Sequence, residues 1–264
     1  MRAIVDGQAI HYDRVGCGPP LYFLHGGPGL DHTYFRPFVD PLSSDAELVF
    51  YDQLGNGRSD RPSVLTCGVD GWARELEGLR AELGHERIDL VAHSFGVLIA
   101  AAYALAFPDR VGAAVLVGAP SVFDFPGIYA TRRARPVSAP NDDESFRQQW
   151  LRRLPSYFHR FDSEVGAALD RNTRYAVKAN QHGIASLSTF DLRARAKHWS
   201  VPSLVVAGRH DNITTLAEGA RPLAAALPGS ELVVFEQSGH FPFIEEQARF
   251  VDVVRAYLRR PRGR

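Results

Sequence analysis

Short apolar runs alternate with segments of helical periodicity along most of the chain. The runs that we expect to form strands cover residues 3–15, 21–26, 47–52, 88–94, 111–119, 201–211 and 231–240. Apolar side chains at helical spacing indicate helices over 70–84 and 243–260, and residues 95–107 are apolar nearly all round, which is typical of a buried helix. This alternation predicts an α/β fold with a mostly parallel central sheet flanked by helices.

The pattern changes between residues 121 and 198. This segment is rich in arginine, irregular in its apolar spacing and interrupted by Pro126, Pro136, Pro140 and Pro155, so we expect short helical pieces there. Strand-like patterning returns after it. We therefore predict a core of residues 1–120 and 199–264 that is interrupted by an insertion over 121–198.

Composition narrows the possible partners. The 264 residues carry 30 basic and 30 acidic side chains, so no overall field favours nucleic acid or an anionic membrane. No apolar run is long enough to span a bilayer, and the opening MRAIVDGQAIHYDR lacks the apolar core of a signal peptide. Cys17 and Cys67 form no metal or redox motif. We expect a cytoplasmic enzyme; the sequence gives no indication of its oligomeric state.

Ser94 is the strongest candidate for chemistry. It lies in Ala92-His93-Ser94-Phe95-Gly96, between a predicted buried strand and a predicted buried helix. A nucleophile at such a sharp strand-to-helix turn needs small residues two positions before and after it. Alanine stands here where glycine is usual. The alternative is a serine in an ordinary turn, but the flanking elements favour a nucleophile.

A serine needs a base and an orienting carboxylate to act as a nucleophile. Asp211 and His240 each follow a predicted strand, in the order serine, acid, histidine. The carboxyl ends of strands in an open α/β sheet are where catalytic groups gather. Asp124, after the 111–119 strand, is a rival acid. Asp211 could instead cap the helix beginning near Thr214, and His240 could cap the last helix.

The glycine-rich stretch His25-Gly26-Gly27-Pro28-Gly29 follows the second predicted strand. Its backbone can approach a substrate closely, so we expect the amides of Gly27 and Phe95 to form an oxyanion hole. The alternative is a turn without a ligand. His93 and His210 flank the catalytic candidates, and we expect structural roles for both. The remaining histidines lack metal-ligand spacing, so we expect neither a metal nor a cofactor.

Together these segments resemble the α/β-hydrolase superfamily over the whole chain and, more narrowly, the proline iminopeptidase family. The resemblance rests on HGGPG at 25–29, DQLGNGRSD at 52–60, AHSFG at 92–96, GRHD at 208–211 and SGH at 238–240. It implies that the insertion is a helical cap over the site, and that carboxylates of the cap grip the free ammonium of a peptide. It also implies structural roles for Asp52, Arg58 and Ser59.

Two departures weaken the implied peptide specificity. Asn212 follows Asp211 where family members often have an acidic group. In the cap, Asp170 and Tyr175 are the candidate substrate-binding residues, with Asp170 the nearest candidate for an ammonium ligand. Asp170 could equally be a solvated charge or pair with Arg174. Residues 131–174 also hold nine arginines against six acidic residues, the opposite of what a cation site favours.

The sequence thus predicts a serine hydrolase that cleaves an amide or ester of a small molecule or short peptide through an acyl-enzyme. The first hypothesis is an aminopeptidase or amidase like the proline iminopeptidases. The second is a carboxylesterase or lactonase acting on a small acyl compound. The third, from another class, is a non-catalytic binding protein with a hydrolase fold, and the intact serine, aspartate and histidine set argues against it.

Overall fold

A computed structural model describes residues 1–66, 68–120, 139–187 and 195–261. Its centre is an eight-stranded sheet of order β1-β2-β4-β3-β5-β6-β7-β8. The strands are β1 (Arg2–Val5), β2 (Gln8–Val15), β3 (Pro20–Leu24), β4 (Glu47–Tyr51), β5 (Ile88–His93), β6 (Val111–Val117), β7 (Ser203–Gly208) and β8 (Glu231–Phe235). From β4 to β8 all neighbours are parallel, which confirms the predicted fold class.

The N-terminal edge differs from the expectation. The run 3–15 is two strands rather than one, because Asp6 and Gly7 both take positive φ (48° and 77°) and turn the chain into an antiparallel hairpin. Paired positive φ values at a two-residue loop match the twist of the strands on either side. β2 then pairs antiparallel with β4. The parallel part of the sheet, where the candidate residues lie, is unaffected.

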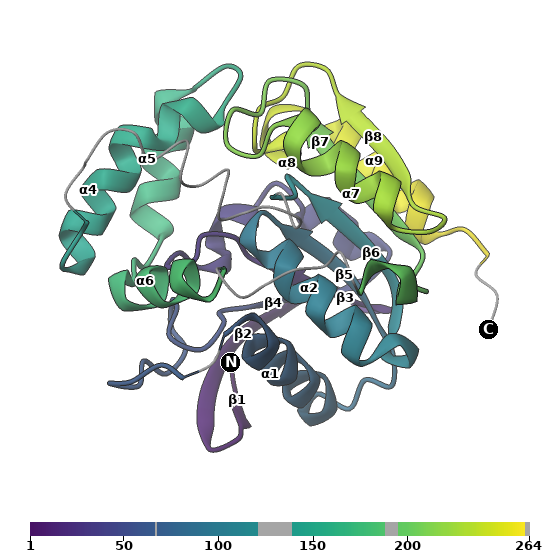
Figure 1. The fold of residues 1–264 in the computed structure, drawn as a ribbon, viewed down its shortest axis with the longest axis horizontal. Helices are drawn as coiled ribbons and strands as arrows, with labels where there is room; N and C mark the ends of the chain where they lie inside the picture. Colours follow the sequence, from purple (N-terminus) through teal and green to yellow (C-terminus); the bar gives the residue numbers. More distant parts are fainter. Residues whose placement is uncertain (67, 121–138, 188–194, 262–264) are drawn as a thin grey trace.

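Helices cover both faces of the sheet (Figure 1). On one face, α1 (Val69–Glu82), α2 (Phe95–Ala106) and α7 (Arg221–Ala226) contribute to a core that includes Tyr22, Leu90 and Val205. On the other, α8 (Pro242–Glu245) and α9 (Gln247–Leu258) pack with the alternate strand positions, such as Phe23 and Val206. The strands are apolar on both sides because both sides are buried, as in other parallel sheets.

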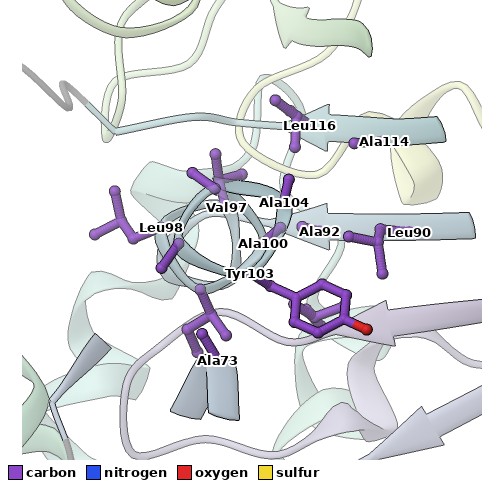
Figure 2. Packing of buried hydrophobic residues seen from close by; sticks show 14 of the residues in the cluster. Ala73, Leu90, Ala92, Val97, Leu98, Ala100, Tyr103, Ala104, Ala114 and Leu116 are labelled. Atoms are coloured by element: carbon purple, nitrogen blue, oxygen red, sulfur yellow. The ribbon is translucent and has the colours of Figure 1, made fainter. Parts of the chain in front are cut away.

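Helix α2 has no polar face. Its side chains Val97, Leu98, Ala100, Tyr103 and Ala104 surround the helix axis in Figure 2, next to residues of β5 and β6. All five are 2 % exposed or less. The prediction of a buried helix after Ser94 is therefore confirmed, and the start of α2 is held rigidly against the sheet.

The described part of the predicted insertion is helical. It contains α4 (Asp143–Arg153), α5 (Ser163–Asn172) and α6 (Val177–Ser186), which lie to one side of the sheet in Figure 1. Asp142 begins α4 by accepting a hydrogen bond from the Ser145 amide, and Asp162 begins α5 in the same way. The boundary predicted at 121 enters a segment outside the described residues, and the limits of the insertion remain a prediction. No helix among the described residues has the length and apolarity to cross a bilayer.

Glycine is required at Gly96, directly after the β5–α2 turn. A Cβ at this position would collide with the Leu24 carbonyl oxygen and lie 2.8 Å from that of His25. Both oxygens belong to the backbone at the end of β3, so neither can move aside cheaply. Glycine here lets α2 start against the neighbouring strand.

We expect Gly96→Ala to lower the free energy of unfolding by about 1–3 kcal/mol, as overpacking does. Without the clash, the same change in a helix would be stabilising. Urea denaturation measures the difference. Gly68→Ala is the control, since its Cβ would meet only Ser186 Cβ, at 3.4 Å. Equal midpoints for the two variants would contradict the proposed crowding.

Candidate functional site

Ser94 occupies the turn between β5 and α2 with a strained backbone. Its φ of 54° and ψ of −120° lie in a region that favours glycine. Two hydrogen bonds of 2.9 Å maintain this backbone conformation. The Ser94 amide donates to the Val117 carbonyl, and the Val97 amide donates to the Ser94 carbonyl. Such strain persists only where the surroundings enforce it, and it is concentrated at functional sites.

The carboxylate of Asp211, just after β7, is buried and fully hydrogen-bonded. Oδ2 lies 2.7 Å from Nδ1 of His240 and accepts from the Thr214 hydroxyl, while Oδ1 accepts from the amides of Ile213 and Thr214. Burial acts to raise the pKa of Asp211, but attraction to His240 and these hydrogen bonds outweigh it and lower the pKa. The group therefore stays ionised. Asp211 accepts bonds from the backbone two and three residues on, so the capping geometry and the contact with His240 coexist.

His240 follows β8, and its ring is 1 % exposed. Because Nδ1 donates to Asp211, the neutral ring carries its lone pair on Nε2. Nε2 is buried and has no hydrogen-bond partner among the described residues. An unpaired polar atom in such a position costs free energy and calls for an explanation. It is available to accept a proton from a group in the adjoining cavity.

A cavity of about 730 Å³ lies between the core and the insertion. Ser94, His240, Gly27 and Phe95 all border it, so the structure brings together four of the five core residues predicted for the site, with Asp211 behind His240. Most of the other lining side chains are apolar, among them Leu30, Leu98, Phe146, Ile184, Leu187, Ile213 and Phe241. The volume suits a small organic molecule.

The glycine-rich loop after β3 passes directly against Ser94. A Cβ on Gly26 would lie 2.9 Å from Ser94 Cβ, and Gly27 takes a φ of 118°. The loop is held from both sides, since the Gly29 amide donates to Asn56 Oδ1 and the Asn180 amide group donates to the Pro28 carbonyl, both at 2.8 Å. Phe95 is the first residue of α2, where a helical N–H has no partner within the helix. Both backbone segments thus border the space beside Ser94.

Tyr34 and His93 form a buried link that sequence reasoning did not find. The Gly26 amide donates to the Tyr34 hydroxyl (2.5 Å), which donates to His93 Nδ1 (2.9 Å), and His93 Nε2 donates to the His240 carbonyl (2.9 Å). Burial, and secondarily the nearby His240, hold the pKa of His93 well below its ordinary value, so the ring is neutral. The structural role expected for His93 is therefore to connect the glycine loop to the backbone of His240. Tyr34 carries no motif that could have identified it.

The loop after β4 is organised around Asp52. Its carboxylate accepts from His32 Nδ1 (2.6 Å) and from the Arg58 amide (2.8 Å), while the Ser59 hydroxyl donates to the Asp52 carbonyl. His32 Nε2 reaches Asp13 at 3.2 Å. These contacts accord with the structural roles that the resemblance implies for Asp52, Arg58 and Ser59.

His32 also belongs to a cluster with His11 and Asp13, whose ligand atoms lie within 4.8 Å of one another. Among the described residues, this is the group with the composition of a metal site. Both nitrogens of His32, however, already contact carboxylates. The three side chains are accounted for as a network of hydrogen bonds and ion pairs.

The cap residues proposed as substrate ligands lie elsewhere. Asp170 accepts two hydrogen bonds from Arg147 (2.7 and 2.5 Å) and one from the Tyr175 hydroxyl (3.0 Å). Neither Asp170 nor Tyr175 is among the residues bordering the cavity. Asp170 as an ammonium ligand thus stays a prediction, and the pairing of its carboxylate with Arg147 and Tyr175 does not favour it. Its partner is Arg147, not Arg174.

Asp124, the rival acid, lies outside the described residues. His210 is exposed and stacks on His159, with ring centroids 3.7 Å apart. The structural role expected for His210 is compatible with that contact.

The pH dependence of stability tests the Asp52 network. Burial acts to lower the pKa of His32, but hydrogen bonds to Asp13 and Asp52 outweigh it and raise the pKa to about 9. Since the unfolded pKa is about 6.5, the stabilisation is complete below pH 6 and is lost as pH rises through 9. We expect unfolding free energy to fall by about 3 kcal/mol between pH 6 and 10 from this group. Urea titrations of the wild type and His32→Asn should differ in this slope; parallel slopes would contradict the assignment.

The sequence and the fold of this chain are similar to those of known proteins. A family model described as the alpha/beta hydrolase fold matches residues 19–247. A proline iminopeptidase of Heyndrickxia coagulans is 28 % identical over 94 % of this chain and 93 % of its own length. A 2-hydroxy-6-oxo-2,4-heptadienoate hydrolase of Pseudomonas putida is 30 % identical over 97 % and 94 %. The structure of an esterase from Exiguobacterium antarcticum superposes with a TM-score of 0.83 at 22 % identity, covering 98 % of this chain and 99 % of that one. The chain belongs to the α/β-hydrolase fold family and is a hydrolase similar to the proline iminopeptidases.

Proposed function

We propose that this chain is a serine hydrolase that cleaves small carboxylic esters, lactones included, through an acyl-enzyme. Ser94 is the nucleophile, His240 the general base and Asp211 the acid that orients it. The amides of Gly27 and Phe95 bind the oxyanion. The observation that carries the proposal is the buried, unpartnered Nε2 of His240, which borders the same cavity as the strained Ser94.

The reaction follows from these positions. Nε2 of His240 takes the proton of Ser94 Oγ as Oγ attacks the carbonyl carbon, and the two amides stabilise the negative charge on the carbonyl oxygen. When this intermediate collapses, the His240 imidazolium gives its proton to the leaving oxygen. Water then attacks the acyl carbon as His240 takes one of its protons. The bond between the acyl carbon and Ser94 Oγ breaks, the acid leaves, and the His240 imidazolium returns the proton to Ser94 Oγ. Asp211 stays ionised throughout and stabilises the imidazolium.

Aminopeptidase activity is the second candidate. It is favoured by HGGPG at 25–29 with DQLGNGRSD at 52–60, and by the curated relatives named proline iminopeptidase. A free N-terminal ammonium needs a carboxylate in the cavity. Glu218 is the one acidic residue among the described lining residues, and it accepts a hydrogen bond from Thr215 Oγ1 at 3.0 Å. Asp170 is bound by Arg147. Because the described cavity wall offers an ammonium group only one carboxylate, esters are the better-supported class of substrate.

Labelling tests the nucleophile. A fluorophosphonate probe is expected to modify the folded protein at Ser94, and Ser94→Ala is expected to abolish labelling and lower ester turnover by about 10⁶-fold, as loss of the nucleophile does elsewhere. Thermal unfolding of Ser94→Ala checks that the fold is intact. Near-normal turnover in this variant would overturn the whole scheme.

A substrate panel tests the class. We expect p-nitrophenyl acetate, butyrate and a small lactone to be hydrolysed, with kcat/KM at least about 100-fold above that for the p-nitroanilides of proline and alanine, since the cavity offers an ammonium group little compensation. The reverse order would establish the aminopeptidase in place of the esterase. His240→Ala and Asp211→Asn should lower the preferred activity whichever substrate is best.

A further inference from the structure

Two arginines of the cap line the cavity, and neither has a carboxylate partner in the part of the chain that the structure describes. Arg152 and Arg153 form the last turn of α4, and both side chains border the cavity beside Ser94 and His240. Neither guanidinium is paired with a described residue. Arg147, one and a half turns earlier on the same helix, differs in this respect because it binds both Glu144 and Asp170. The cap therefore neutralises one arginine of α4 and leaves two at the cavity.

Arg153 borders the same cavity as the proposed base. Burial raises the pKa of Tyr157, one turn along the chain, and the positive charge of Arg153 acts to lower it. The Tyr157 ring packs edge-on against the His240 ring, with centroids 5.3 Å apart, and the Tyr157 carbonyl accepts the His240 amide at 2.6 Å. A group bound by Arg153 would lie in the cavity that Ser94 and His240 also border.

The rest of the wall offers little other ionic recognition. The side-chain amides of Asn180 and Gln181 donate to the carbonyls of Pro28 and Pro140. Against the two arginines stands one described acidic lining residue, Glu218, which accepts from Thr215. The other described residues that line the cavity are largely apolar. Arginine binds carboxylates through two parallel N–H···O bonds, which adds orientation as well as energy.

We propose that Arg152 and Arg153 form a carboxylate-binding subsite, so that the substrate is an acyl compound with an apolar body and an anionic carboxylate at one end. This inference rests on the proposed ester hydrolase activity. The apolar walls hold the body of the molecule, and the arginines fix its charged end. The scissile carbonyl is thereby directed towards Ser94.

Two kinds of measurement test the subsite. The first compares kcat/KM for p-nitrophenyl hydrogen adipate with that for its neutral p-nitrophenyl methyl adipate ester, after subtraction of spontaneous hydrolysis. The second measures equilibrium binding of pentanoate and of uncharged pentanamide by tryptophan fluorescence, since Trp150 borders the cavity. Binding needs no turnover, so it tests the subsite even if both esters are inert and the proposed function fails.

The wild type is expected to prefer the anionic ester and to bind pentanoate more tightly than pentanamide, each by about 10-fold or more. The double variant Arg152→Gln/Arg153→Gln should lose both preferences and keep neutral-ester turnover within about 3-fold, because hydrogen bonds to charged groups carry the discrimination. Arg171→Gln, on the exposed side of α5, is the control for a change in net charge. Equal loss in the control, a parallel loss for both esters, or no preference in the wild type would overturn the subsite.

Discussion

The turn at Ser94 constrains the structure around it more than any other feature. A serine at a φ of 54° requires the chain to pass from β5 into α2 within a very short distance, so α2 must start against the end of β3. Gly96 and Gly26 have no side chain because the neighbouring backbone or Ser94 itself occupies that space. The apolar surface buried by α2 supplies the free energy that holds the turn. The strain is local, whereas the packing that sustains it extends over the sheet.

Two buried carboxylates, Asp52 and Asp211, are each held by several donors in separate parts of the structure. Beneath the glycine loop, Asp52 and His32 form a buried pair that hydrogen bonds extend to the Arg58 amide and to Asp13. Next to the cavity, Asp211 is satisfied by two amides and a hydroxyl before it contacts His240. A carboxylate with so many donors can remain ionised inside the protein. In both places the backbone supplies part of the stabilisation, so the side chains are held in one orientation.

The sequence predicted the core well because its signals are local. Buried parallel strands are continuous apolar runs, and the candidate residues Ser94, Asp211 and His240 lie in the segments that follow three of them. The contacts of the cap could not be predicted in this way. Arg147 and Asp170 are 23 residues apart on different helices, and only tertiary packing brings them together. Tyr34 is similarly hidden, since its partner Gly26 lies in the loop after β3 and its partner His93 ends β5. The hairpin at Asp6–Gly7 was missed because apolar residues continue on both sides of the turn.

The bond between the His240 amide and the Tyr157 carbonyl has a consequence for engineering. Together with the contacts of Glu245 to the amides of His159 and Arg160, it joins the cap backbone to the segment that carries the imidazole. Exchange of the whole insertion for that of another hydrolase would remove an acceptor from the backbone of His240. A chimaera that retains residues 157–160 and replaces only the helices beyond them would leave the imidazole anchored. In this protein, the unit that can be grafted is smaller than the insertion itself.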